Sequence, residues 1–151
     1  YGAGSSFGFR LWPGPFTIFT AVQTEVTDKA LAEILKELEA IRQPIPAEEL
    51  ERGKNYVALR FPARFQSVRD IADQLEELIV YNLPDSYFND YVRQILAVTP
   101  EAAQKAASRY LDPARVAIVV VGDRQRIEPA LRALNIGPVK VLTVDEVMGR
   151  R

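Results

Sequence analysis

The sequence predicts an α+β fold in which helices pack on one face of an antiparallel or mixed sheet. Three observations support this prediction. Two runs with alternating apolar residues come first, several segments with apolar residues at helical spacing follow, and a β-α-β pattern ends the chain. No internal repeat, low-complexity stretch or linker interrupts this order, so residues 1–151 are expected to form a single domain.

The first two strands are expected at residues 5–12 and 16–23, because apolar and polar residues alternate with period two in both runs. Between them stands Pro13-Gly14-Pro15, which is strong turn punctuation. The two strands are therefore expected to form a hairpin or meander with a short link.

Two long helices are expected next. Thr27 is the expected N-cap of the first, whose apolar stripe runs to Ile41. Pro44-Ile45-Pro46 ends that helix and begins the second, which Pro62 ends. Gly53 lies within the apolar stripe of the second helix and therefore predicts the close approach of a neighbouring backbone.

Four further helices have start signals at Ser67, Asp85, Thr99 and Asp123. Ser67 is followed three residues later by Asp70, a spacing that resembles a capping box. Each of the four segments carries apolar residues at helical spacing, so all four are expected to present one face to a core.

The last two strands are expected at residues 115–122 and 139–144, on either side of the helix that Asp123 begins. The first is an unbroken apolar run, which is typical of a strand buried on both faces or central in its sheet. Four strands make a small sheet for so much apolar surface, so we expect that the first elements of the domain are missing. The alternative is that four strands suffice.

Composition limits the function classes. The 19 basic and 20 acidic residues are scattered along the chain and give a net charge of −1, so nucleic acid is not an expected partner. The longest apolar run, residues 116–121, is too short to span a bilayer. With no His and no Cys, the chain has neither the usual zinc ligands nor a His-based triad. No metal ligand is expected, and the chain is not expected to be catalytic alone.

Two acidic or glycine-containing segments have a structural and a functional interpretation. Glu48, Glu49 and Glu51 could suggest a metal site, but favourable charge at a helix N-terminus and a solvated face explain them better. Gly122-Asp123 follows a strand-like run but lacks the glycine spacing and the lysine of a nucleotide-binding loop.

Arginines and aromatic residues also allow two interpretations. Three arginines that bracket Pro62 could bind substrate carboxylates, although an exposed corner between helices is favoured: Arg60, Arg64 and Arg69. Four aromatic residues of the first two strands could form a peptide-binding wall, although a core position is favoured: Phe7, Phe9, Phe16 and Phe19. At most the sheet face opposite the helices is expected to touch substrate.

Long segments of the chain resemble one known family. They are YGAGSSFGFR, GPFTIFTAVQTEVTDKALAEILKELEAIR, PIPAEELERGKNYVALRFPARFQS and LPDSYFNDYVRQILAVTPEAAQKAASRYLDPARVAIVVVGD. In this order they resemble the C-terminal, non-zinc-binding half-domain of insulinase/pitrilysin-type zinc metallopeptidases, in the bacterial processing-peptidase branch. The ordered succession of segments, over essentially the whole chain, carries the resemblance.

The resemblance implies one half of a clamshell of two homologous α+β halves that enclose a chamber. The other half carries the inverted motif H-x-x-E-H and binds zinc. The half without the motif donates an Arg and a Tyr, spaced Arg-x₆-Tyr, whose guanidinium and phenol stabilise the developing oxyanion. Tyr1 matches the family tyrosine and is the one catalytic residue implied here. The matching Arg would lie roughly seven residues before Tyr1, outside this chain.

The expected function is therefore to close the chamber and assist peptide-bond hydrolysis by a zinc-bearing partner domain or subunit. Partners would be that H-x-x-E-H half, in a homo- or heterodimer or on one polypeptide, and an extended peptide substrate. The alternatives are a catalytically inactive structural or assembly homologue of the same family, and an unrelated α+β binding module. Bacterial relatives are often exported, which favours the periplasm or cell envelope over the cytoplasm and leaves the compartment open.

Overall fold

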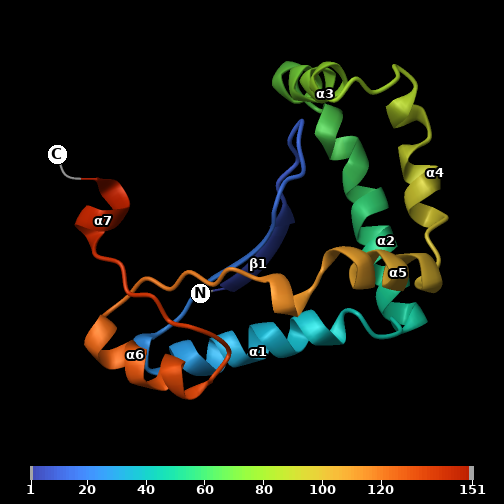
Figure 1. Cartoon of the computed structure of the whole chain (residues 1–151). Coiled ribbons are helices and arrows are strands. Elements are labelled where there is room, and N and C mark those ends of the chain that lie inside the picture. Colours follow the sequence, from blue (N-terminus) through green and yellow to red (C-terminus); the bar gives the residue numbers. More distant parts are fainter. Residues whose placement is uncertain (1, 150–151) are drawn as a thin grey trace.

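The computed structural model describes residues 2–149 and has a mixed α+β architecture, as the sequence predicts (Figure 1). One antiparallel sheet contains the two strands β1 (Gly2–Phe7) and β2 (Phe16–Ala21). The helices are α1 (Thr27–Ala40), α2 (Ala47–Arg60), α3 (Val68–Val80), α4 (Tyr91–Leu96), α5 (Pro100–Tyr110), α6 (Arg124–Ala133) and α7 (Val144–Met148). Short 3-10 turns lie at Thr24–Val26, Phe61–Phe65, Tyr87–Asn89 and Pro113–Arg115.

The expected N-terminal hairpin is confirmed, with different strand bounds. Gly2 pairs with Ala21 at one end and Phe7 with Phe16 at the other, where the two rings lie 4.8 Å apart. Residues 8–12 were expected in the first strand but belong to the loop. The reason is that Pro13 and Pro15 have no N–H to donate to a ladder, so pairing ends where the Gly8 N–H donates to the Pro15 carbonyl.

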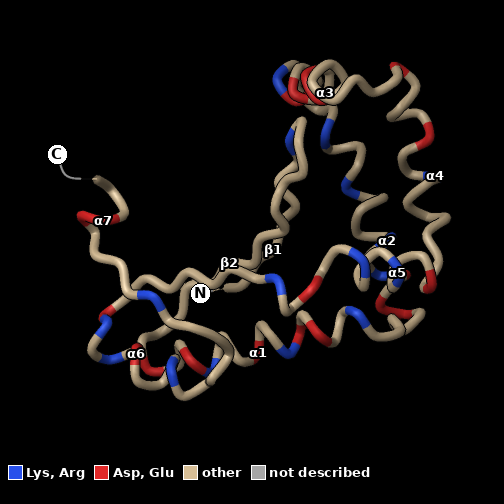
Figure 2. Tube along the Cα trace, viewed as in Figure 1, with Lys and Arg blue, Asp and Glu red and all other residues tan. Residues whose placement is uncertain are grey.

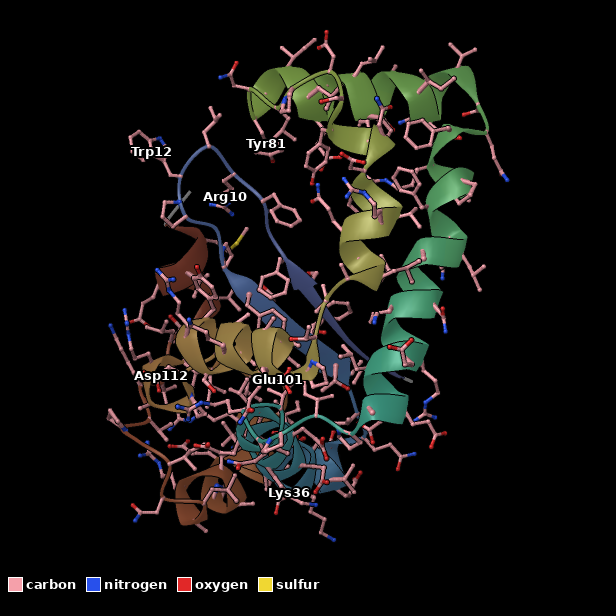
Figure 3. The ribbon with its side chains drawn as sticks, turned by 90° about the vertical axis from the view of Figure 1, so that its right-hand side faces the viewer. Arg10, Trp12, Lys36, Tyr81, Glu101 and Asp112 are labelled. Carbon is pink, nitrogen blue, oxygen red and sulfur yellow. The ribbon has the colours of Figure 1, made fainter. Side chains whose placement is uncertain are left out.

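The hairpin loop depends on a glycine. A Cβ atom added to Gly14 would lie 1.6 Å from the carbonyl oxygen of Gly8, so no other residue fits there without moving the backbone. The loop beyond this contact carries Arg10 and Trp12, and Trp12 lies at the outer end of the hairpin with 81% of its surface exposed (Figure 3).

Helix starts follow the sequence closely. Ser67 and Asp70 form the expected capping box of α3, since Ser67 Oγ accepts from the Asp70 N–H and Asp70 Oδ2 accepts from the Ser67 N–H. Thr99 caps α5 and Asp123 caps α6, also as expected.

Two helix starts differ from expectation. Thr27 is the first residue of α1 rather than its N-cap, because a 3-10 turn precedes it and its hydroxyl donates to the Thr24 carbonyl at 3.0 Å. Asp85 makes no cap: the segment it was expected to begin is a 3-10 turn at Tyr87–Asn89, whose first N–H donates to the Pro84 carbonyl, and then α4.

The two expected C-terminal strands are not found. Residues 116–121 and 139–142 are extended, but their backbone groups form no hydrogen bonds within the described part of the chain. Val144, expected to end the last strand, instead begins α7, where Thr143 and Glu146 form a capping box. The physical reason is that a strand needs a ladder partner, and residues 2–149 provide none beside these two segments.

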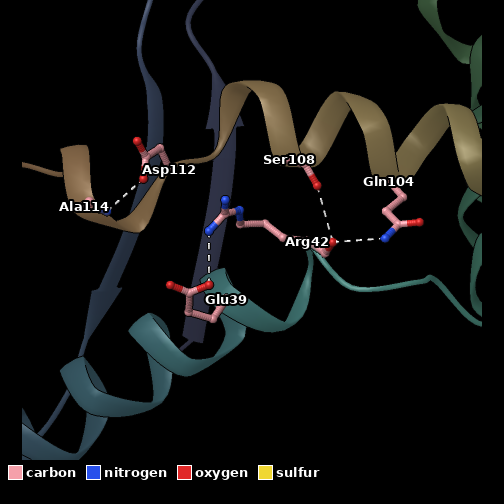
Figure 4. Close-up of polar contacts among 6 residues, drawn as sticks. All are labelled: Glu39, Arg42, Gln104, Ser108, Asp112 and Ala114. Atoms are coloured by element: carbon pink, nitrogen blue, oxygen red, sulfur yellow. Dashed lines mark hydrogen bonds and ion pairs between the residues drawn. The ribbon is translucent and has the colours of Figure 1, made fainter.

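The helices form an open frame rather than a closed layer (Figure 1). Helix α6 packs beside α1, and α4 packs beside α2, whereas the two strands contact chiefly each other. The end of α1 is tied to α5 where the Arg42 carbonyl accepts from Gln104 Nε2 and Ser108 Oγ, each at 3.4 Å (Figure 4). The hairpin thus stands at one side of the frame, apart from the helices that should cover it.

Very little of the chain is buried. Among the described residues, only three hydrophobic side chains are buried, namely Leu38, Leu111 and Ile127. The accessible surface is 12429 Å², whereas a compact monomer of 16.9 kDa exposes about 7,700 Å². The excess of roughly 4,700 Å² means that much of the apolar surface encoded in the sequence has no cover in this structure.

Within residues 2–149, no helix has the length and apolar character that a membrane crossing requires. The sequence-based expectation that the chain has no such span agrees with this finding.

The isolated chain is expected to bind anilinonaphthalene sulfonate strongly and to melt over a broad temperature range. Both follow from the exposed apolar surface and from the lack of a large cooperative core. Dye fluorescence and a thermal melt followed by far-UV circular dichroism measure the two properties. A steep melt together with weak dye fluorescence would contradict the open structure.

Candidate functional site

An apolar groove lies between the hairpin and the first two helices, with a volume of about 1280 Å³. The hairpin contributes Phe7, Phe16 and Ile18, and α1 contributes Ile34 and Leu38. Further apolar lining comes from Ile45, Leu50, Val57, Ile95, Val98 and Leu111. We define this surface as the hairpin groove. Because its lining is mostly hydrophobic, it is suited to bind apolar side chains.

The alternation within the hairpin explains which residues reach the groove. In β2, Phe16, Ile18 and Thr20 line it, which is the face that the period-two pattern predicts. Phe19 lies on the opposite face and is 60% exposed. It covers Gly4, where an added Cβ atom would lie 2.6 Å from the Phe19 ring.

The four aromatic residues singled out from the sequence are therefore divided between different environments. Phe7 and Phe16 face the groove, Phe19 faces away from it, and Phe9 lies in the loop with 76% of its surface exposed. The expected core position is wrong for Phe7, Phe9 and Phe19, which are 56%, 76% and 60% exposed, because none of the described helices covers these rings.

The strand edges beside the groove are free. Strands β1 and β2 pair with each other along their full length, so within the described residues each strand has one edge without a ladder partner. Free N–H and C=O groups at such an edge can pair with an added extended polypeptide. An extended peptide can therefore place apolar side chains in the groove while its main chain pairs with the strand edge.

Gly53 forms part of the groove lining on α2. The close approach of a neighbouring backbone, expected there from the sequence, is not found: a Cβ atom added to Gly53 would meet nothing within 4 Å. The groove is open at this point, so no described segment reaches the glycine. A glycine in a helix interior costs about 0.5–1 kcal/mol relative to alanine, and no contact within residues 2–149 accounts for this cost.

The rim of the groove is charged. Glu33 accepts from Lys36 Nζ at 2.8 Å, and this hydrogen bond is the main reason that the pKa of Lys36 is raised. On α2, Lys54 pairs with Glu51 at 2.7 Å. Glu37 and Glu49 also line the groove, and neither takes part in an ion pair among the described residues. In the tube view, charged residues lie on the helices and on the segments that connect them, whereas the hairpin carries only Arg10 (Figure 2).

The arginines near Pro62 have separate roles. Arg64 donates to Glu77 at 2.6 Å, and its guanidinium lies within 5.9 Å of the rings of Phe61, Phe88 and Tyr91. Phe61 and Tyr91 are themselves stacked at 4.7 Å. We call these residues the aromatic corner. Arg64 therefore links the 3-10 turn that follows α2 to α3 and α4, and its side chain is only a third exposed.

The other two arginines lie outside the aromatic corner. Arg60 bonds the Tyr56 hydroxyl, and Arg69 is exposed at the start of α3. For Arg64, the interpretation as part of a corner between helices agrees with the structure, although the corner is half-buried rather than exposed.

The acidic cluster at the start of α2 behaves as helix-terminal charge. Glu48 and Glu49 lie in the first turn, and Glu51 is paired with Lys54. Within residues 2–149, no group of three His, Cys, Asp or Glu side chains is placed to hold a metal ion. The segment Gly122-Asp123 has a local role, since Asp123 Oδ1 accepts from the Gln125 N–H and caps α6.

Tyr1, the one catalytic residue implied by the resemblance, lies outside the described residues. Its role stays a prediction. The groove itself was not predicted as a site, although its two walls were. The signal that could have indicated it is Gly53 in an otherwise apolar helix face.

A scan of protein-family models finds no match to this chain, and a search of curated proteins finds none either.

Gly53→Ala is expected to slow amide hydrogen exchange in α2 by about two- to fivefold, since alanine stabilises a helix interior by about 0.5–1 kcal/mol over glycine and the space is open. Ala58→Gly, on the same helix, should speed exchange and serves as the control. Faster exchange in Gly53→Ala would show that the space is not open.

Arg64→Met is expected to speed amide exchange in α3 about fivefold, through the loss of about 1 kcal/mol from the ion pair with Glu77 and the contacts with the aromatic rings. Arg69→Met removes an exposed arginine from the same region and should have little effect. Equal effects of the two substitutions would contradict a structural role for Arg64.

Proposed function

We propose that this chain is a polypeptide-binding, non-zinc-binding half of an insulinase-type zinc metallopeptidase, which closes a chamber over an extended peptide. The observation that carries the proposal is the free strand edge beside an apolar groove. An extended peptide can pair its main chain with such an edge regardless of most side chains, which suits the broad sequence tolerance of a chamber peptidase.

Two further features support this proposal. The segments quoted above resemble the C-terminal half-domain of this family in their order along nearly the whole chain. The chain also contains no His and no Cys, so an H-x-x-E-H motif would have to come from another domain or subunit.

In this proposal, the partner half and this chain would have different roles in peptide-bond hydrolysis. Zinc, held by the partner half, would supply an activated water. This chain would bind and orient the peptide at the hairpin, and the phenol of Tyr1 would donate a hydrogen bond to the developing oxyanion. No residue of this chain is proposed as a general base or as a metal ligand.

A structural or assembly subunit of the same family is the second candidate. The large uncovered apolar surface favours it, because a surface of that size is typical of obligate association. The two candidates differ in Tyr1, which has a chemical role only in the first.

Zinc analysis and a peptidase assay should be performed on this chain alone and on this chain mixed with the H-x-x-E-H half encoded on the same gene or beside it. We expect neither stoichiometric zinc nor cleavage from the chain alone, and metal-dependent cleavage from the mixture. Metal-dependent cleavage by the isolated chain would overturn the proposal.

Tyr1→Phe distinguishes the two candidates in the same mixture. If Tyr1 is an oxyanion donor, kcat should fall by about 10²–10³. Tyr110→Phe, which alters an exposed tyrosine on α5, should leave kcat unchanged. An unchanged kcat in Tyr1→Phe would instead favour the structural subunit.

A further inference from the structure

We infer that a pocket at the aromatic corner binds a small zwitterion, namely a free amino acid or short peptide with an ammonium group, a carboxylate and an aromatic side chain. The pocket has a volume of about 490 Å³, which is typical of small-ligand sites. Its lining includes Arg60 of α2, Phe61 and Arg64 of the 3-10 turn, Asp73 of α3 and Tyr91 of α4. We define this surface as the corner pocket.

The corner pocket is separate from the site proposed for the extended peptide. It shares only Val57 with the hairpin groove and includes no residue of the hairpin. Binding of a zwitterion there requires neither zinc nor a partner half, so this inference does not depend on the proposed function.

The walls of the corner pocket are held in place by contacts within the described chain. Arg64 is paired with Glu77 at 2.6 Å, and the rings of Phe61 and Tyr91 are stacked at 4.7 Å. In Figure 1, α3 lies across the end of α2, and α4 runs beside α2. The corner pocket is therefore a hollow between elements that already pack on one another, whereas the hairpin groove separates elements that do not.

Opposite charges line the corner pocket from different helices. Helix α2 contributes the guanidinium of Arg60, which bonds the Tyr56 hydroxyl, and α3 contributes the carboxylates of Asp70 and Asp73. Asp70 is already engaged in the capping box, since its Oδ2 accepts from the N–H and the hydroxyl of Ser67. Arg60 and Asp73 take part in no ion pair among residues 2–149. These two side chains match the carboxylate and the ammonium group of a zwitterion.

Gln74 adds a hydrogen-bond acceptor to the same helix. It lines the pocket, and its Oε1 is buried without a hydrogen-bond partner among the described residues. Because a buried oxygen without a partner is unfavourable, a rotation of the amide toward a donor in the pocket would be favourable. An ammonium group has three N–H donors and can therefore serve Asp73 and Gln74 together.

The aromatic residues favour a ligand with a ring. Phe61 and Tyr91 line the pocket, and Tyr56, which also lines it, is 60% exposed. An aromatic side chain of the ligand can extend this cluster, and aromatic pairs contribute more than their buried area alone.

The charges also argue against a further segment of polypeptide as the occupant. A segment that completed a hydrophobic core here would bury the four charged side chains of the lining: Arg60, Arg64, Asp70 and Asp73. Burial of charged side chains without full pairing is costly. A small zwitterion instead brings both opposite charges and leaves the rest of the pocket open to water.

Isothermal titration calorimetry of this chain with phenylalanine and with glycylphenylalanine tests the inference. We expect at least one of them to bind with a dissociation constant of about 1 mM or lower. N-acetylation removes the ammonium group and amidation removes the carboxylate, and each should weaken binding about fivefold or more. Absence of binding by both compounds would overturn the inference. Equal binding of the free and blocked forms would also overturn it, because the ring alone would then be bound at an apolar surface such as the hairpin groove.

Two variants locate the two charges. Arg60→Met should remove the effect of amidation, and Asp73→Asn should remove the effect of N-acetylation, because each variant lacks the group that matches the blocked charge. Arg69→Met and Glu76→Gln change exposed charges of α3 outside the pocket lining and should leave the affinity unchanged. Circular dichroism of the four variants checks that the helices still form. If the first two variants bound the zwitterion as tightly as the two controls, the inference would be wrong.

Nuclear Overhauser effects on the unmodified chain give a readout that does not depend on the variants. Ring protons of the bound ligand should show them to Phe61 and Tyr91, which line the pocket. Effects to Phe7 and Phe16 instead would place the ligand in the hairpin groove and would contradict the inference. Since no step uses zinc or peptidase activity, a negative result here differs from a negative cleavage assay.

Discussion

The apolar faces of the hairpin, α1 and α2 all turn toward one groove, and the described chain has too few strands to fill it. This constraint explains most of the architecture. Only three hydrophobic side chains are buried among residues 2–149, the hairpin stands apart from the helices, and Gly53 faces open space. Hydrophobic burial is the main stabilising term in folding, so a chain with this surface depends on whatever covers it.

In contrast to the hairpin groove, the aromatic corner is formed entirely by residues of the described chain. At the aromatic corner, Arg64 contacts Glu77 and three aromatic rings, and these contacts join the 3-10 turn after α2 to α3 and α4. All its members lie between residues 61 and 91, so they meet through short connections with a low entropic cost of loop closure. The helical frame can therefore form locally, while the sheet requires strands that are distant in the sequence or belong to another chain.

The sequence allowed the walls of the candidate site to be predicted but not the site. The alternating hairpin and the apolar stripe of α1 indicated two surfaces that would pack on each other. The groove arises because the hairpin and α1 do not pack against each other. A local sequence pattern does not predict the distance between two elements. For Arg64, the pattern of three arginines around Pro62 could not distinguish a ligand site from a corner, since the deciding partners Glu77 and Phe88 come from other elements.

The helix starts could be predicted from the sequence, because each cap side chain accepts a hydrogen bond from a backbone N–H only a few residues away. Ser67 with Asp70, Thr99 and Asp123 each accept a backbone N–H two or three positions further on, so the local sequence contains the complete interaction. Residues 116–121 and 139–142 have the composition of strands and are extended, but a strand is completed by a ladder to a distant partner. The sequence by itself determined which segments of this chain form helices and which segments have an extended conformation suited to strand pairing. Which of those strands are paired was settled by tertiary contacts, because a backbone hydrogen bond between strands needs two segments and each local pattern specifies only one.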